Sequence, residues 1–345
     1  MERRHKIAVI PGDGIGPEVI DAAVLVLKAL MRIDPDLKLD LTRGEVGEPA
    51  YEKYGNPLPK ESLELIGKSN AVLFGAVGEL ATSVVLPLRQ QFDLFANVRP
   101  AYTFEGVPAL QKKVDIVIVR ENTEDVYKGI GYSIDDTHFV ALRLFTKRGM
   151  ERIVRYAFEL ARREGRKSVL LAHKAPVITH TDLPFLNCFK EISQEYTDIE
   201  ARDMLIDSCA MKVIMTPEMF DVILVSNLMG DILSDVSAAV IGGLGFAPSG
   251  NIGENLAMFE PIHGSAPQFA GKHIVNPIGA ILSAKMMLEW LGEKGAASQI
   301  HSAVSRVLKE GKIRTFDLGG DSTTEEMAEE IIKKIEEQRR TKPGT

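Results

Sequence analysis

The sequence predicts an α/β protein in which helices flank a sheet of buried strands and two domains enclose a cleft. Short apolar runs rich in β-branched residues alternate with helical segments along the chain. Several of these runs are apolar throughout, which is typical of parallel strands buried on both faces. The chain of 345 residues is also longer than a typical single domain.

Composition narrows the class of protein. Hydrophobic residues make up 45% of the chain and charged residues 26%, which are ordinary globular values. The net charge of −7 argues against a nucleic-acid-binding protein, which normally shows a basic face. No apolar run approaches the roughly 20 residues of a membrane span, and no signal-type region leads the chain, so we expect a soluble, cytoplasmic protein. Cys188 and Cys209 lack metal-ligand spacing and are expected to be buried free thiols.

The first strand is predicted at residues 6–11, followed by a glycine-rich loop at 12–16. Pro17 falls in the first turn of the next helix, where its missing N–H costs nothing. A glycine loop between a strand and a helix is a common binding place for phosphates and cofactors. The spacing is not Gly-x-Gly-x-x-Gly, however, and a tight turn explains the loop equally well.

Three arginines fall at or near the ends of predicted elements. Strands are expected at residues 70–75 and 115–119, and Arg89, Arg99 and Arg120 lie between or just after them. The carboxyl edge of a sheet would bring such residues together, and the planar guanidinium suits bidentate binding of carboxylates. The alternative for each is an ordinary surface arginine.

The middle of the chain continues the alternation. Residues 141–147 have the loose alternation of a half-exposed strand, and 150–164 form a predicted helix that ends at Gly165. A strand over 168–172 leads into Lys174. This lysine either lies in a cleft with a lowered pKa or extends to water, as surface lysines commonly do.

A pair of aspartates opens the helix that follows the strand predicted at 220–225. Asp231 and Asp235 are four residues apart, so they share one helix face. Two like charges repel unless a cation lies between them, and oxygen ligands suit Mg²⁺ or Mn²⁺. The alternative is an acidic helix N-terminus. Asp207, at the end of another candidate strand, supplies a third carboxylate at an element terminus.

The C-terminal third contains two glycine-rich or small-residue stretches, 242–253 and 263–267. Free N–H groups there suit a pyrophosphate, although plain turns are again possible. Thr323 and Glu326 form a capping box for a last helix.

Five sequence features occur together and in the order found in one enzyme family, the β-decarboxylating dehydrogenases. They are the segments 12–18, 120–127, 227–235 and 260–277 and the arginine set Arg89, Arg99 and Arg120. The family comprises isocitrate, 3-isopropylmalate, homoisocitrate and tartrate dehydrogenases, and the resemblance covers nearly the whole chain.

The resemblance implies a two-domain isocitrate/isopropylmalate dehydrogenase-like fold with a mixed sheet flanked by helices, not the standard Rossmann topology. It implies a discontinuous large cofactor-binding domain at 1–98 and 253–345. The small domain, 99–252, would carry the dimer interface and an arm near 132–148. We therefore expect a homodimer, with pairing of two dimers into a tetramer as the alternative.

The resemblance also assigns site residues. Arg89, Arg99 and Arg120 would hold substrate carboxylates, and Asp207, Asp231 and Asp235 would hold Mg²⁺ or Mn²⁺. Lys174 and Asp207 would complete the site of the partner subunit. The cofactor-binding residues would be Glu260, His263, Gly264, Ser265, Ala266, Gln268 and Asn276.

A mechanism follows from these roles. With the metal lowering the pKa of the substrate 2-hydroxyl, Lys174 would take its proton during hydride transfer to the nicotinamide. After loss of the 3-carboxylate as CO₂, Tyr127 would protonate the product carbon. The stretch His173-Lys174-Ala175-Pro176 departs from the family's usual Lys-Ala-Asn, because Pro176 stands where the Asn is expected, and this removes an amide near the nicotinamide.

The cofactor and substrate preferences depend on a few positions. Gln268 stands where NAD-using relatives have Asp and NADP-using ones Lys, so we expect NAD to be favoured modestly and NADP to remain possible. Ser83, Val85 and Leu86 would line the pocket for the substrate's variable group. If the residues leading into Arg89 are helical, Thr82 shares its face with Val85 and Leu86 and also lines the pocket. Because Pro87 is best tolerated in a first helical turn, the alternative is a helix that starts near Val85 with Thr82 in a loop.

The mixed character of this pocket predicts broad specificity over 3-isopropylmalate, isocitrate and homoisocitrate. The alternative is a dedicated NAD- or NADP-dependent isocitrate dehydrogenase. A phosphoryl or prenyl-diphosphate enzyme would not need the convergent arginines, and a non-catalytic ligand-binding relative would have lost Lys174, Tyr127 or an aspartate.

Overall fold

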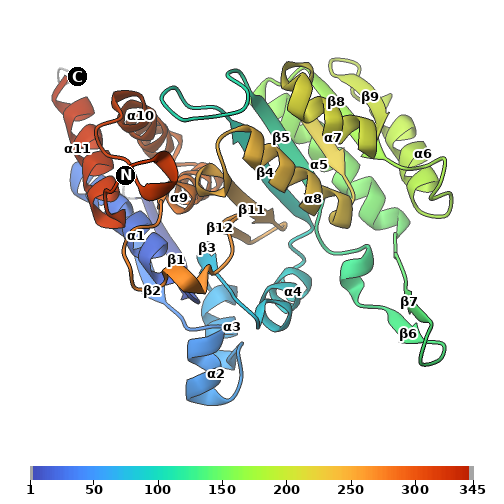
Figure 1. Ribbon diagram of the computed structural model, residues 1–345, viewed down its shortest axis with the longest axis horizontal. Coiled ribbons are helices and arrows are strands. Elements are labelled where there is room, and N and C mark those ends of the chain that lie inside the picture. The colour runs from blue at the N-terminus through green and yellow to red at the C-terminus, as the bar shows by residue number, and fades with distance from the viewer. Residues whose placement is uncertain (1–2, 342–345) are drawn as a thin grey trace.

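One ten-stranded mixed sheet runs through the whole computed structural model, which describes residues 3–341 (Figure 1). The strand order is β2-β1-β3-β12-β11-β4-β5-β10-β8-β9. Strand β11 is antiparallel to both neighbours and β4 is antiparallel to β5, whereas the remaining pairs are parallel. The predicted mixed, non-Rossmann sheet is therefore confirmed.

The strands are β1 (Arg3–Gly12), β2 (Leu37–Arg43), β3 (Ala71–Ala76), β4 (Ala96–Tyr102), β5 (Asp115–Glu121), β6 (Gly131–Ser133), β7 (Phe139–Ala141), β8 (Ser168–His173), β9 (Glu200–Leu205), β10 (Val222–Val225), β11 (Pro248–Ile252) and β12 (Ala257–Pro261). The α-helices are α1 (Gly16–Ile33), α2 (Glu48–Tyr54), α3 (Lys60–Gly67), α4 (Ala81–Gln91), α5 (Lys147–Glu164), α6 (Asp182–Ser193), α7 (Ile206–Met215), α8 (Asn227–Val240), α9 (Ile278–Trp290), α10 (Lys294–Glu310) and α11 (Thr324–Thr341). Short 3₁₀ turns are η1 (Val126–Lys128), η2 (Pro217–Met219), η3 (Leu244–Phe246), η4 (Pro267–Phe269) and η5 (Phe316–Leu318).

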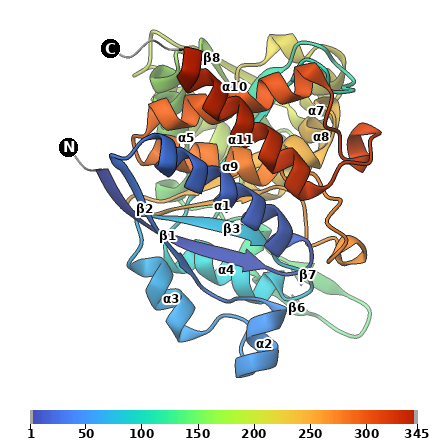
Figure 2. The ribbon, with the colours of Figure 1, turned by 90° about the vertical axis from the view of Figure 1, so that its left-hand side faces the viewer.

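The N-terminal strands are covered on both faces, as their apolar sequences require. Figure 2 shows β1 and β3 between α1, α9 and α11 on one side and α3 and α4 on the other. Ile7 and Val9 of β1 pack into the first of these layers, and Ala8 and Ile10 pack into the second. Alternate side chains of one strand thus serve opposite faces of the sheet.

Helix ends follow the predicted signals. Gly165 terminates α5 with a left-handed φ of 70°, a conformation that glycine adopts at little cost. At the start of α11, the N–H of Glu326 donates to Thr323 Oγ1 at 3.1 Å and the N–H of Thr323 donates to Glu326 Oε2 at 2.8 Å. This reciprocal pair is the predicted capping box.

Two predictions of local structure are wrong. The strand predicted at 141–147 is mostly irregular: Ala141 ends β7, Lys147 begins α5, and between them only Leu144 forms a bridge, with Asp125. Helix α4 begins at Ala81 with Pro87 inside it, so the alternative of a helix that starts near Val85 is wrong and Thr82 is helical. Pro87 lies on the exposed helix face, where water can bond the carbonyl that the missing N–H leaves free.

The β6–β7 hairpin stands apart from the main sheet and projects from it (Figure 1). Its apolar side chains are exposed, with Ile134 at 64% and Phe139 at 74% of full accessibility. Exposed apolar clusters of this kind mark contact surfaces.

Cys188 and Cys209 are free thiols, as predicted, but only Cys209 is buried, because Cys188 is partly exposed. No helix between residues 3 and 341 combines the length and the apolar character needed to cross a membrane.

Candidate active site

Three buried arginines converge from separate elements. Arg89 lies near the end of α4, Arg120 near the end of β5, and Arg99 inside β4, so the expectation that all three lie at element ends is wrong for Arg99. Arg99 Nη1 lies 3.3 Å from Asp231 Oδ1, and Arg120 forms an ion pair with the same oxygen. The antiparallel pairing of β4 with β5 brings Arg99 and Arg120 together.

Two polar residues of α8 orient these arginines. Asn227 Oδ1 accepts hydrogen bonds from Arg120 Nε at 3.0 Å and Nη2 at 2.6 Å. Ser234 Oγ accepts from Arg99 Nη1 at 2.6 Å. Sequence reasoning did not single out either residue. Helical spacing could have indicated them, because Asn227 lies four residues before Asp231 and Ser234 three residues after it, which places all three on one helix face.

The arginine cluster is electrostatically suited to an anion. Burial, reinforced by the charge of Arg120, lowers the pKa of Arg99 to about 10, which still leaves it charged at neutral pH. Burial also lowers the pKa of Arg89. The Nε atoms of Arg89 and Arg99 are buried and have no hydrogen-bond partner among the described residues. Buried, unsatisfied cationic donors are costly unless a ligand pairs with them.

Asp231 and Asp235 face the same region, since both approach Arg99, the latter at 3.8 Å. Burial opposes ionisation of Asp231, but Arg120 and Arg99 outweigh it and lower its pKa. Burial raises the pKa of Asp235, and the negative charge of Asp231 adds to this effect. Both side chains remain partly open to solvent. Two carboxylates with mutual repulsion and open coordination space fit a divalent cation.

The third predicted metal ligand lies elsewhere in the subunit. Asp207, at the start of α7, accepts a 2.5 Å hydrogen bond from Lys174 Nζ. That bond lowers the pKa of Asp207. Residues 3–341 contain no group of three or more His, Cys, Asp or Glu side chains placed to hold a metal. Within one subunit, Asp207 therefore does not join Asp231 and Asp235.

Tyr127 belongs to the same site as Asp231. Its Oη donates to Asp231 Oδ2 at 2.6 Å, and the guanidinium carbon of Arg120 lies 5.1 Å from its ring centre. Burial and the bond to Asp231 raise the pKa of Tyr127. The phenol therefore keeps its proton at neutral pH and can donate it.

The predicted cofactor segment packs against the glycine loop after β1. The N–H of Ile15 donates to the carbonyl of Ser265 at 2.9 Å. A Cβ at Gly14, whose φ is +57°, would lie 2.0 Å from that carbonyl, so only glycine fits there. Ala266, which follows Ser265, has the left-handed φ of 37°. Gly264 is exposed at the turn.

The remaining predicted cofactor residues have contacts outside this loop. Glu260 Oε1 accepts from Asn251 at 2.7 Å and lies 3.5 Å from Arg89, which connects the segment to the arginine cluster. Burial lowers the pKa of His263, whose Nε2 is buried without a hydrogen-bond partner among residues 3–341. Asn276 donates to Asp317 at 2.9 Å.

Gln268 is exposed in η4. The ring of its neighbour Phe269 lies 5.1 Å from that of Phe316, so η4 and η5 pack together.

Comparison with known proteins identifies the family to which this fold and this site belong. Residues 6–331 match the family described as isocitrate/isopropylmalate dehydrogenase.

The chain belongs to the isocitrate/isopropylmalate dehydrogenase family.

It is 47% identical to 3-isopropylmalate dehydrogenase of Archaeoglobus fulgidus over 96% of this chain and 99% of the relative. It is 45% identical to isocitrate/homoisocitrate dehydrogenase of Thermus thermophilus, over 96% of this chain and 98% of the relative. The crystal structure of isocitrate dehydrogenase from Methylococcus capsulatus has a TM-score of 0.92 and 43% identity, with 96% of this chain and 99% of that one covered. The family assignment confirms the predicted resemblance and fold. The protein is a dehydrogenase that decarboxylates a small carboxylate substrate and uses a nicotinamide cofactor.

Proposed function

We propose that the protein oxidises and decarboxylates 2-hydroxy-3-carboxy acids, with broad specificity over 3-isopropylmalate, isocitrate and homoisocitrate, and favours NAD over NADP. The observation that carries this proposal is the buried arginine cluster, which faces Asp231, Asp235 and Tyr127. Within residues 3–341, the Nε donors of Arg89 and Arg99 have no hydrogen-bond partner. Such an arrangement suits a substrate with more than one carboxylate. A dedicated isocitrate dehydrogenase remains the second candidate, because Ser83 is kept beside the apolar Val85 and Leu86.

The proposed site is shared between two subunits of a homodimer. Asp207 and Lys174 lie together and away from the arginine cluster, so a partner subunit would bring them to it. Exposed apolar side chains support such a contact: Met211 and Met215 lie on α7 with Asp207, and Ile232 lies on α8 next to Asp231. The β6–β7 arm would add to the same interface.

The proposed domains divide the sheet between them. The large domain would comprise 1–98 and 253–345 and the small domain 99–252. The first boundary falls inside β4 and the second follows the end of β11, so the sheet is continuous across both.

Asp231 and Asp235, with Asp207 of a second copy, would hold Mg²⁺ or Mn²⁺. When bound, the cation would polarise the substrate's 2-oxygen, and the nicotinamide would accept the hydride. The arginines bind and orient the carboxylates. Lys174 of the second copy accepts the hydroxyl proton during oxidation, and Tyr127 donates a proton to carbon after CO₂ leaves.

The test is to supply the purified protein with each of the three acids, Mg²⁺ or Mn²⁺, and NAD or NADP. Expected results are reduced nicotinamide and an equal amount of CO₂, both abolished by a chelator and restored by added metal. The Asp235→Asn variant should need more metal for half-maximal rate. Cofactor reduction without CO₂, or no reduction with any of the acids, would contradict the proposal.

A further inference from the structure

A largely buried arginine connects two loops that carry different site residues. Arg143, in the segment after β7, binds Asp125 through Nε at 2.6 Å and Nη2 at 2.9 Å. Its Nη1 donates to Asp182 Oδ1 at 2.9 Å. Both aspartates are 1% exposed. We call these three residues the arginine bridge.

The Asp125 end of the bridge supports the loop of Tyr127. Asp125 has a φ of 66° and a ψ of −151°, a backbone conformation that is strained for any residue except glycine. Its carboxylate accepts from the N–H of Val126 at 2.9 Å and from the N–H of Leu228, at the start of α8, at 3.2 Å. A strained residue persists only where its surroundings hold it, and Arg143 supplies the charged, bidentate part of that support.

The Asp182 end supports the loop of Lys174. Asp182 Oδ2 accepts the backbone N–H of Lys174 at 2.7 Å, while its Oδ1 is held by Arg143. The backbone from which Lys174 extends is therefore fixed by the same guanidinium that fixes the turn before Tyr127.

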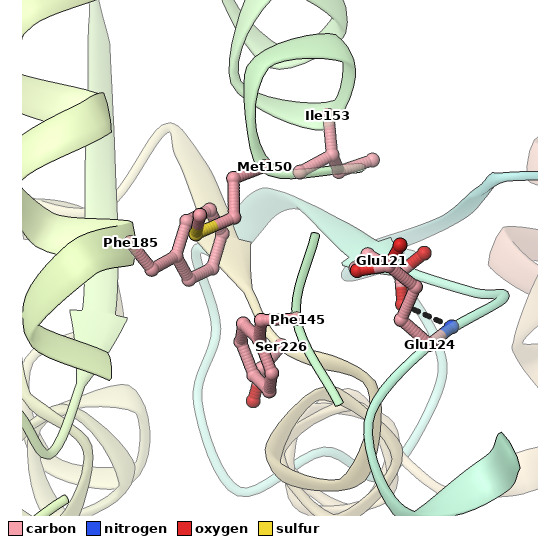
Figure 3. Close-up of a pocket in the computed structure, with 7 residues that line it drawn as sticks. All are labelled: Glu121, Glu124, Phe145, Met150, Ile153, Phe185 and Ser226. Carbon is pink, nitrogen blue, oxygen red and sulfur yellow. Dashed lines mark hydrogen bonds between the residues drawn. The ribbon is translucent and has the colours of Figure 1, made fainter. Parts of the chain in front are cut away.

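The bridge has little room to rearrange. Arg143 lies over the ring of Phe145 at 5.0 Å, and its Nη2 also donates to Ser226 Oγ at 3.1 Å. Phe145 and Ser226 line a cavity of about 10 Å³ together with Glu121 and Glu124 (Figure 3). A space of that size holds at most about one water molecule, so it gives Phe145 and Ser226 little room to move away from Arg143.

We propose that Arg143 is a positioning residue that sets Tyr127 and Lys174 relative to one another through Asp125 and Asp182. This inference rests on the shared site proposed above, in which Tyr127 serves its own subunit's site and Lys174 serves the partner's. In the dimer, one guanidinium therefore positions a proton donor for one site and a proton acceptor for the other.

Heterodimers with one intact site test this directly. A Lys174→Ala chain keeps Tyr127, and a Tyr127→Phe chain keeps Lys174, so a mixed dimer isolated with two affinity tags has one complete site. Arg143→Met is then introduced into either chain separately. Arg143→Lys, which retains a positive charge, serves where Arg143→Met does not fold. Arg148→Gln, an exposed neighbour on α5, is the matched control.

Arg143→Met should slow a different step of the reaction in each of the two chains. In the chain that supplies Lys174, Arg143→Met should slow reduction of the 2-keto-3-carboxy intermediate. In the chain that supplies Tyr127, it should slow conversion of that intermediate to the final keto acid. Each loss should be about 10²-fold, as expected for misplacement on the order of 1 Å. Hydrogen exchange should speed up at residues 125–129 and 174–182 but not in α1 or α9.

The possible results distinguish a failure of the role proposed for Arg143 from a failure of the proposed shared site. If the parent heterodimer has no more activity than its single-variant homodimers, the shared site itself is wrong. If the parent is active but Arg143→Met acts from only one chain, or slows both steps equally from each chain, the bridge does not have the proposed role. An equal loss with Arg148→Gln would also overturn it.

Discussion

At the scale of single residues, Tyr127 and Lys174 lie in different environments, and we propose different roles for them. Tyr127 has a raised pKa and points at Asp231, whereas Lys174 is paired with Asp207. We predict that Lys174→Ala and Tyr127→Phe each lose about 10²–10⁴-fold in overall rate, as general acid–base groups do. Only Lys174→Ala should fail to reduce a supplied 2-keto-3-carboxy intermediate. Equal impairment of both variants in that assay would refute the division of roles.

Gln268 is the position at which we expect a single substitution to change the preference between NAD and NADP. It is exposed and neutral, so it neither attracts nor repels a 2′-phosphate. We predict a modest NAD preference in the parent, and an increase of about tenfold in the NAD/NADP ratio of kcat/KM for Gln268→Asp, because a carboxylate repels the phosphate. Gln268→Asn is the neutral control. A parent enzyme that uses NADP better than NAD would show that other residues decide the preference.

Much of the site was predictable residue by residue, but its assembly was not. The shared helix face of Asp231 and Asp235 was predictable, because helical spacing depends only on residues that are close in the sequence. Arg99 was misplaced, because antiparallel pairing of β4 with β5 cannot be read from the arginine's own neighbours. The spacing of Asn227 and Ser234 indicated their shared helix face with Asp231, but not their arginine partners, which come from distant strands.

At the scale of elements, we propose that α4 determines which substrates fit. Because the helix begins at Ala81, Thr82, Val85 and Leu86 all share the face of Arg89. We predict kcat/KM values for 3-isopropylmalate, isocitrate and homoisocitrate within about 10²-fold, since a hydrophobic pocket discriminates by only about 1–3 kcal/mol per methylene.

Substitutions in α4 test whether this helix sets the substrate preference. Val85→Asn should shift the ratio toward isocitrate by about tenfold, because its amide can bond the third carboxylate. Ser83→Ala should lower activity on isocitrate and leave 3-isopropylmalate nearly unchanged. A parent preference above about 10⁴-fold for one acid would show that contacts outside α4 set the choice.

At the scale of the whole molecule, the β6–β7 arm should control activity through assembly. Phe139→Asp places a charge on the exposed apolar tip, so we predict monomers that retain their helical circular dichroism but lose about 10²–10⁴-fold in rate, because each site lacks its Lys174. Asp136→Asn, on the same hairpin, is the control. Sedimentation and rate are measured together, and a fully active monomer would disprove the shared site.

The order of strands along the chain was largely predictable, whereas their order in the sheet was not. A strand such as β3 is predictable from its apolar composition, which is typical of a buried strand, and all six of its residues are indeed buried. Nothing local in the sequence indicates that Met258 of β12 pairs with Val72 of β3, or that β11 pairs with β4.

The placement of β11 and β12 between β3 and β4 also has a consequence during synthesis on the ribosome. Both strands are translated long after their neighbours, so a nascent chain that ends before Pro248 presents β3 and β4 with open edges. Open edges readily pair with other chains. The centre of the sheet is thus finished late in translation, and prematurely released chains would be prone to aggregate.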